Sequence, residues 1–206
     1  MAQLSAQVSN GPLVGFYRST LEKSLNNVYP SIEKPIHGLA GSVGYFVGGS
    51  AGKAFSIRGE FMVKIRHYSY AFDTRSAEGD YQLTLGAIQI PALLVLRIHG
   101  GLRLMMGPMI DMRSMANNSV KGSRYPSEAE FDWNDSFTSD LKTIGIGFVA
   151  GLDYRTQRSV SIGLRMEHGI TRLLKKGIGI DANVMDLGLL VSFDILGGPG
   201  SKPPSE

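Results

Sequence analysis

Four histidines are the side chains of this 206-residue chain best suited to acid–base chemistry, namely His37, His67, His99 and His168. A histidine supports hydrolysis when a neighbouring serine, aspartate or glutamate orients it or is activated by it. Glu167 directly precedes His168 and invites that interpretation. Adjacent residues of a strand point to opposite faces, however, so the two side chains cannot form a catalytic pair there. The sequence therefore predicts no catalytic residues.

Other patterns that could bind a cofactor or a polymer are weak. The chain has no cysteine, which excludes disulfides and thiolate metal sites. The segment GGSAGK at 48–53 has the composition of a phosphate loop but neither its full spacing nor its strand–loop–helix context. Basic residues are dispersed and the net charge is only +3, so there is no nucleic-acid footprint. We expect no cofactor, no metal ion and no nucleic-acid partner.

A period of two dominates the chain and is clearest in FSIRGEFMVKIRH, residues 55–67. Odd positions from Phe55 to Ile65 are apolar apart from Gly59, and even positions are polar or charged apart from Met62. A strand with this alternation has one apolar and one charged face. No segment sustains the helical period of 3.6. The other segments that we interpret as strands are 12–21, 39–47, 88–98, 102–113, 143–154, 160–171 and 185–195.

Short and long connections alternate between these segments. The short ones are 48–53, 99–101 and 155–159. The long ones are 22–38, 73–80, 114–141 and 172–183. This alternation is typical of an up-and-down meander whose short turns share one end. The chain is thus predicted to be all-β, an eight-stranded antiparallel up-and-down transmembrane β-barrel over 11–196, between an N-terminal segment (1–10) and a flexible C-terminal tail (197–206).

The alternation fits either a soluble barrel with an apolar core or a membrane barrel with an apolar exterior. The polar face favours the membrane barrel, because it combines many strand glycines with charges of both signs that can pair in a narrow interior. An interior of eight strands is just wide enough to be filled by side chains, so we interpret these charges as a structural plug rather than a pore. The predicted lumen charge network is Arg58, Glu60, Lys64, Arg66, Arg103, Asp111, Arg113, Asp153, Arg165, Glu167 and Asp186.

The longest predicted loop, 114–140, is the candidate partner-binding element. Long loops on a rigid scaffold often carry binding, and aromatic side chains are common anchors of protein interfaces. The alternative is a loop that only folds over the barrel mouth. The candidate binding residues are Tyr125, Phe131, Trp133 and Phe137.

Several strand motifs resemble a known family. GAIQIPALLVLRI (86–98) resembles the strand EIPLLLKY of the PorT-like outer-membrane β-barrel family, and GLRLMMGPMIDM (101–112) is similar to the strand that follows it. The resemblance extends over about 11–195. It implies contact with outer-membrane lipid and a structural or interaction role in a cell-envelope complex, with a link to protein secretion.

We therefore expect a mature chain in the bacterial outer membrane, after removal of a signal peptide, that contacts protein partners and is not an enzyme. Two alternatives belong to other classes. A small outer-membrane enzyme acting on lipid would lose activity when His37 or His67 is changed. A soluble lipocalin-like ligand binder would need no detergent.

Overall fold

The fold consists of nine antiparallel strands. They are β1 (Val8–Glu22), β2 (Ile36–Ser50), β3 (Phe55–Asp73), β4 (Ala77–His99), β5 (Leu102–Arg124), β6 (Ala129–Ser136), β7 (Ile144–Arg155), β8 (Val160–Gly169) and β9 (Asn183–Phe193). The computed structural model describes residues 8–22, 35–50, 54–73, 77–124, 129–136, 138, 141–156, 159–173 and 183–195. Within these ranges, no helix is long and apolar enough to cross a bilayer.

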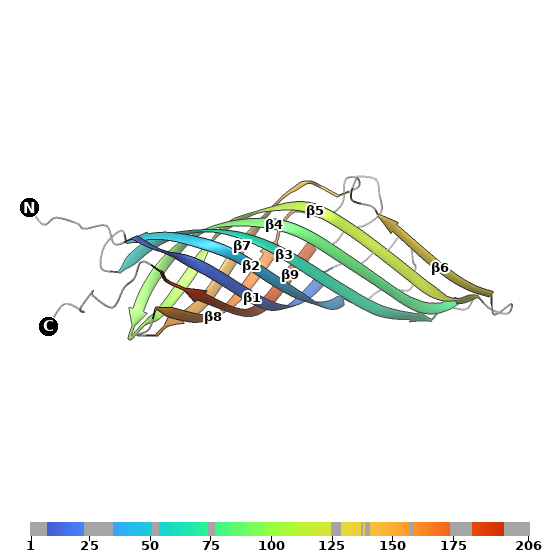
Figure 1. Ribbon diagram of the computed structural model, residues 1–206, viewed down its shortest axis with the longest axis horizontal. Helices are drawn as coiled ribbons and strands as arrows, with labels where there is room; N and C mark the ends of the chain where they lie inside the picture. The colour runs from blue at the N-terminus through green and yellow to red at the C-terminus, as the bar shows by residue number, and fades with distance from the viewer. Residues whose placement is uncertain are drawn as a thin grey trace, which may run out of the picture.

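Eight of the nine strands close into a barrel (Figure 1). Sequential strands pair from β1 to β5, β5 then pairs with β7, and β7, β8 and β9 follow in order. The ring closes where β9 pairs with β1. The predicted eight-stranded antiparallel barrel is confirmed. Of the predicted terminal segments, Val8–Asn10 belong to β1, whereas 1–7 and 197–206 lie outside the described residues.

Burial in the barrel follows the alternation of the sequence. On β3, Lys64 and Arg66 are 0% and 3% exposed, whereas Val63 and Ile65 are 44% and 53% exposed. The charged face is therefore the inside of the barrel and the apolar face is the outside. An apolar exterior on a ring without strand edges suits lipid, which offers no partner for backbone groups.

The tightest described turn identifies one end of the barrel. Gly100 and Gly101 connect β4 to β5 with φ angles of 55° and 91°, the left-handed region that two-residue hairpins require. β1 begins and β9 ends on the same side (Figure 1, left). In outer-membrane barrels the short turns lie on the periplasmic side, so we call this end the inner end and the opposite end the outer end.

Three barrel strands continue well beyond the outer end. β3 and β4 stay paired out to Asp73 and Glu78, and β4 and β5 out to Ala77 and Arg124. β6 pairs with the outer part of β5, past the point where β7 leaves it. We call this four-stranded extension the protruding sheet (Figure 1, right). Its segments are 68–73, 77–86, 115–124 and 129–136.

The protruding sheet corrects two sequence predictions. The loops predicted at 73–80 and 114–141 are largely strand, because β4 starts at Ala77, β5 runs to Arg124 and β6 follows. The period of two continues there, but the apolar residues change face. On β4, lipid-facing Ile88 and Ile90 are even-numbered, whereas the buried Leu83 of the extension is odd-numbered. Such a phase shift resembles the end of a strand in the sequence alone.

A β-bulge at Ser114 lies where the barrel becomes the protruding sheet. The β4–β5 register shifts by one residue between Gly86 and Ala87. Ser114 is the extra residue, and its Oγ donates a hydrogen bond to the carbonyl of Gly86 at 3.4 Å. Bulges bend a strand and often end a pairing. Here β7 pairs with β5 as far as Met112, before the bulge, and β6 pairs with β5 from Asn117, after it.

Candidate functional site

Asp186 on β9 is the centre of an ion-pair network inside the barrel. Its carboxylate accepts hydrogen bonds from Lys64 Nζ at 3.1 Å and from Arg66 at 2.9 and 3.0 Å, both on β3. Ser19 Oγ also donates to Asp186, and it lies 2.7 Å from the hydroxyl of Tyr68. All of these side chains are buried. The contacts tie β1, β3 and β9 together across the lumen.

Glu60 organises a second group nearer the inner end. The guanidinium of Arg165 binds it through two nitrogens at 2.6 and 2.8 Å, and Arg58 Nε lies 2.7 Å away. Lys64 links the two groups through Glu167, because it donates to Glu167 at 2.6 Å and Glu167 Oε1 lies 3.9 Å from Arg165 Nη1. Bidentate arginine–carboxylate pairs are among the stronger and more directional polar contacts.

Similar pairs lie near the two ends of the lumen. At the inner end, Arg103 makes a bidentate contact with Asp153 at 2.6 and 2.7 Å. At the outer end, Arg113 Nε donates to Asp111 at 3.2 Å, and its other nitrogens bind the carbonyls of residues 171–173. Every residue of the predicted lumen charge network thus faces the interior and has an ionic partner.

Aromatic rings fill the space between these charges. Lys64 Nζ lies 3.5 Å from the ring centre of Tyr17, and the guanidinium of Arg58 lies 4.0 Å from that of Phe46. Such cation–π contacts stabilise a desolvated cation. The interior therefore holds a packed plug, as the small diameter of an eight-stranded barrel implies.

The histidines do not form a catalytic group. His37 Nδ1 lies 3.1 Å from the hydroxyl of Thr20, and His67 is bonded in the same way to Thr84. His168 faces outward with Nδ1 3.8 Å from Glu22, while its neighbour in sequence, Glu167, is buried in the lumen. His99 is exposed at the end of β4. In the described part of the chain, no three histidine, aspartate or glutamate side chains are placed to hold a metal ion.

The inner face of the protruding sheet is an apolar cluster over the barrel mouth. Phe131, a predicted binding residue, is half-buried and packs against this cluster. Trp133 lies on β6 opposite Val120, and Tyr125 and Phe137 lie outside the described residues. The cluster comprises Leu21, Ile36, Tyr68, Tyr81, Leu83, Leu85, Ala116, Val120, Leu141, Leu173 and Val184, with Tyr70 and Phe131 against it. Phe131 therefore contributes to packing, with part of its ring still accessible.

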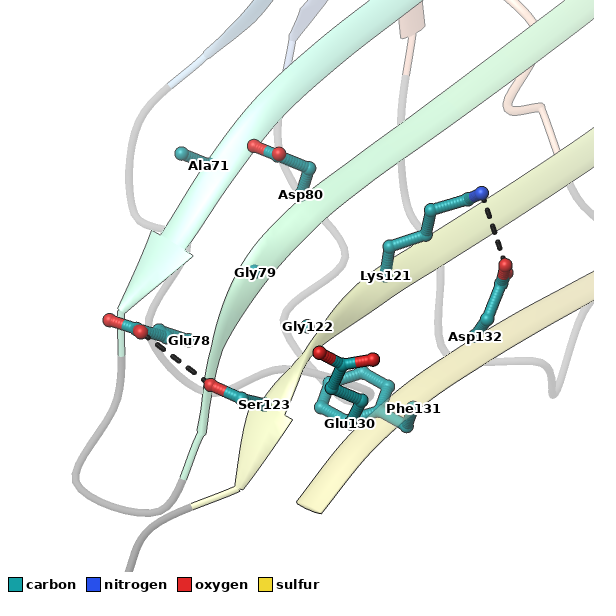
Figure 2. Close-up of a pocket in the computed structure, with 10 residues that line it drawn as sticks. All are labelled: Ala71, Glu78, Gly79, Asp80, Lys121, Gly122, Ser123, Glu130, Phe131 and Asp132. Carbon is teal, nitrogen blue, oxygen red and sulfur yellow. Dashed lines mark hydrogen bonds and ion pairs between the residues drawn. The ribbon is translucent and has the colours of Figure 1, made fainter. Parts of the chain in front are cut away.

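The outer face of the same sheet is polar. Near its tip a hollow of about 850 Å³ is lined by four carboxylates and one lysine, and Lys121 Nζ lies 3.0 Å from Asp132 (Figure 2). Closer to the barrel, a second hollow of about 430 Å³ is lined by amides and hydroxyls. We call this surface the polar face. Its residues are Glu78, Asp80, Gln82, Thr84, Asn117, Ser119, Lys121, Asn134, Ser136, Glu130 and Asp132.

The polar face was not predicted from the sequence, because most of its residues fell in segments interpreted as loops. A usable signal was present. In EGDYQLT at 78–84, polar residues occupy the even positions and Gly79, Tyr81 and Leu83 the odd ones. That alternation has the opposite sense to the neighbouring lipid-facing segment.

Comparison with known proteins identifies the type of barrel. The family model described as "Outer membrane protein beta-barrel domain" matches residues 1–175. The chain belongs to this family. It is a bacterial outer-membrane β-barrel protein, and the alternative of a soluble lipocalin-like binder is wrong. No curated protein matches the chain.

Two solved structures are similar to the chain. Neisserial surface protein A is 11% identical, with a TM-score of 0.51 over 89% of this chain and 96% of that one. Ail, the attachment invasion locus protein of Yersinia pestis, solved in complex with the heparin analogue sucrose octasulfate, is 14% identical. Its TM-score is 0.44 over 91% of this chain and 99% of that chain. At these identities the first likeness supports the barrel fold alone.

Proposed function

We propose that this outer-membrane barrel is a non-catalytic interaction component of a cell-envelope complex, and that it binds a protein partner through the polar face of the protruding sheet. The observation that carries the proposal is the sidedness of that sheet. Its apolar face is buried in the cluster over the barrel mouth. The other face is therefore exposed as a broad polar surface. A packed lumen suits an anchor better than a channel.

The charge of the polar face suggests the chemistry of the partner. Glu78, Asp80, Glu130 and Asp132 carry four negative charges, and Lys121 carries the positive charge among the residues that line the tip hollow. Complementary charge speeds association and suppresses wrong partners. A partner with a basic surface is therefore expected. The link to protein secretion implied by the PorT-like resemblance stays a prediction.

A position-specific photo-crosslinking experiment in intact envelopes tests this proposal. A photoreactive amino acid replaces Asn134 on the polar face, or Ile146 on the lipid-facing wall as the matched control. We expect a discrete protein adduct from position 134 and none from position 146. The adduct should weaken when Asp80→Asn and Glu130→Gln are combined, because both changes remove negative charge. Identical adducts from both positions, or an adduct indifferent to the charge changes, would contradict the proposal.

Two measurements address the other possible roles. Planar-bilayer recording should show no stepwise conductance, because charged and aromatic side chains fill the lumen. Incubation with phospholipid vesicles should release no fatty acid. Hydrolysis that disappears in His67→Ala would instead favour the alternative of an outer-membrane enzyme acting on lipid.

A further inference from the structure

Arg18 is a charged residue in a lipid-facing row of the barrel. Its side chain is exposed, on the outward face of β1, two residues beyond the exposed Phe16. Its direct neighbours across the sheet are Leu39 on β2 and Leu187 on β9, which are 73% and 54% exposed. Among the described residues, Arg18 has no ion-pair partner. The position therefore exposes an isolated cation between apolar side chains.

The position of Arg18 along β1 places it near the outer boundary of the lipid layer. Thr20 is the next outward-facing residue of β1 after Arg18, toward the outer end, and it pairs with His37 on β2. The two form a polar pair with 3.1 Å between Thr20 Oγ1 and His37 Nδ1. A cation on the lipid face costs free energy that falls toward the interface. Because an arginine side chain is long, its guanidinium can reach the headgroup level from an apolar position. There it meets the first groups of the lipid that carry charge.

His37 provides a second donor beside Arg18. Arg18 pairs with Leu39, so His37 is its diagonal neighbour on the same face, roughly 7–8 Å away. The contact with Thr20 occupies Nδ1, and among the described residues Nε2 has no hydrogen-bond partner. Glu22 is the nearest acid along β1, but it is directed to His168 on β8, whose Nδ1 lies 3.8 Å from it. Two possible donors thus lie next to each other on the outward face near the outer end of the barrel wall.

We propose that Arg18 and His37 bind the phosphate group of an outer-leaflet lipid whose acyl chains lie on Phe16, Leu39 and Leu187. A guanidinium fork matches phosphate oxygens in geometry and charge, and His37 Nε2 supplies a further donor when its proton is on that nitrogen. The exposed apolar side chains below supply the surface for the acyl chains. This lipid site lies on the barrel wall and is separate from the polar face.

The test uses the full-length chain in an uncharged polyoxyethylene detergent and lipid A, a diphosphorylated glycolipid, as the probe. Binding is measured by native mass spectrometry and calorimetry, with heat-modifiability on gels as the check that each variant is folded. We expect Arg18→Gln to weaken binding about tenfold and His37→Gln about threefold, because each change removes donors to a charged group. The matched control Arg97→Gln removes an exposed guanidinium at the inner end of β4 and should leave binding unchanged.

Three results would overturn the proposal. The first is equal affinity of Arg18→Gln and the unchanged protein. The second is equal binding of dephosphorylated lipid A, since the phosphate would then be irrelevant. The third is full competition by millimolar inorganic phosphate, which would indicate a site for a soluble anion rather than for a lipid. Loss of binding with dephosphorylated lipid A, together with weak competition by inorganic phosphate, supports the proposal.

Discussion

Along β3, the inward side chains change from Lys64 and Arg66 in the barrel to Tyr68 and Tyr70 in the protruding sheet. The outward side chains change from the apolar Val63 and Ile65, through His67 at the boundary, to Ser69. The strand keeps its pleat through this change, so the two regions differ only in which face is apolar. The surroundings explain the difference. The barrel wall faces lipid and encloses polar groups, whereas the protruding sheet faces water and encloses an apolar cluster. The same strand therefore suits lipid in its first part and water in its second part.

The barrel and the protruding sheet are also stabilised by different interactions. The barrel interior relies on ion pairs whose members come from distant strands, such as Lys64 with Glu167 and with Asp186. The protruding sheet relies on apolar packing and carries its charges on the exposed side, where Lys121 and Asp132 are both largely accessible. Buried charges are costly when a partner is lost, whereas exposed pairs contribute little. The same substitution should therefore have very different effects in the two regions.

The largest expected effect is that of Asp186→Asn. This nearly isosteric change leaves Arg66 without its carboxylate and removes one of the two partners of Lys64. We expect the free energy of unfolding to fall by about 3–5 kcal/mol. Asp132→Asn, the matched change in the exposed pair, should alter it by no more than about 0.5 kcal/mol. Urea titration in detergent micelles, followed by circular dichroism, measures both. Equal losses would show that the lumen pairs are not the main support of the barrel.

Leu83→Ala probes the apolar cluster of the protruding sheet. Leu83 is buried on the inner face of β4, and truncation there should cost about 3 kcal/mol through lost packing and a cavity. Leu94→Ala, on the lipid-facing side of the same strand, leaves no enclosed cavity and should cost less. Amide hydrogen exchange resolves where the loss occurs, with faster exchange expected in 77–86 for Leu83→Ala. A larger loss at Leu94 would contradict the reversed sidedness.

A charge placed on the outward face of β3 should lower stability in the barrel but not in the protruding sheet, because the outward face is apolar in the barrel and polar in the protruding sheet. Val63→Lys puts a cation on the lipid-facing part of β3 and should destabilise the folded state in vesicles by about 2 kcal/mol. Ala71→Lys, outward on the same strand but in the protruding sheet, should change stability by less than about 0.5 kcal/mol. Equilibrium folding into phosphatidylcholine vesicles gives both values. Equal penalties would place the protruding sheet inside the lipid layer.

The smallest effect is expected at the outward Gly41 of β2, and the inward Gly44 of the same strand provides the contrast. A Cβ on outward Gly41 would meet no atom within 4 Å, so Gly41→Ala should stabilise the protein by about 0.5–1 kcal/mol by restricting the unfolded chain. A Cβ on Gly44 would lie 2.2 Å from the carbonyl oxygen of Phe61, so Gly44→Ala should destabilise it. Urea midpoints of the two variants measure the difference. A gain at Gly44 would indicate more room inside the barrel than the contacts suggest.

Much of the barrel could be predicted, because its evidence is local. The period-two alternation over 55–67 and the other segments can be read directly from neighbouring residues. The charged face carries charges of both signs, which indicated that this face would be enclosed. The polar face was harder to recognise in this way. Its strands were recognisable only by an alternation of opposite phase, and β6 is a short acidic strand that is defined by its pairing with β5. The candidate binding residues were chosen as loop residues, but Phe131 lies on a strand with its ring against the cluster.

By itself, the sequence determined the class of structure, the eight barrel strands and the residues that face the lumen. Successive side chains of an extended chain point to opposite faces because of the backbone geometry, whichever strand the chain pairs with. Only the tertiary structure decided which cation meets which acid, such as Arg165 with Glu60, because these residues come together through ring closure across more than a hundred positions. It also decided where the apolar residues change from the outer to the inner face along β3, β4 and β5. A period of two in the sequence indicates that a strand has two unlike faces. The surroundings of the folded chain determine which of these faces is the outside.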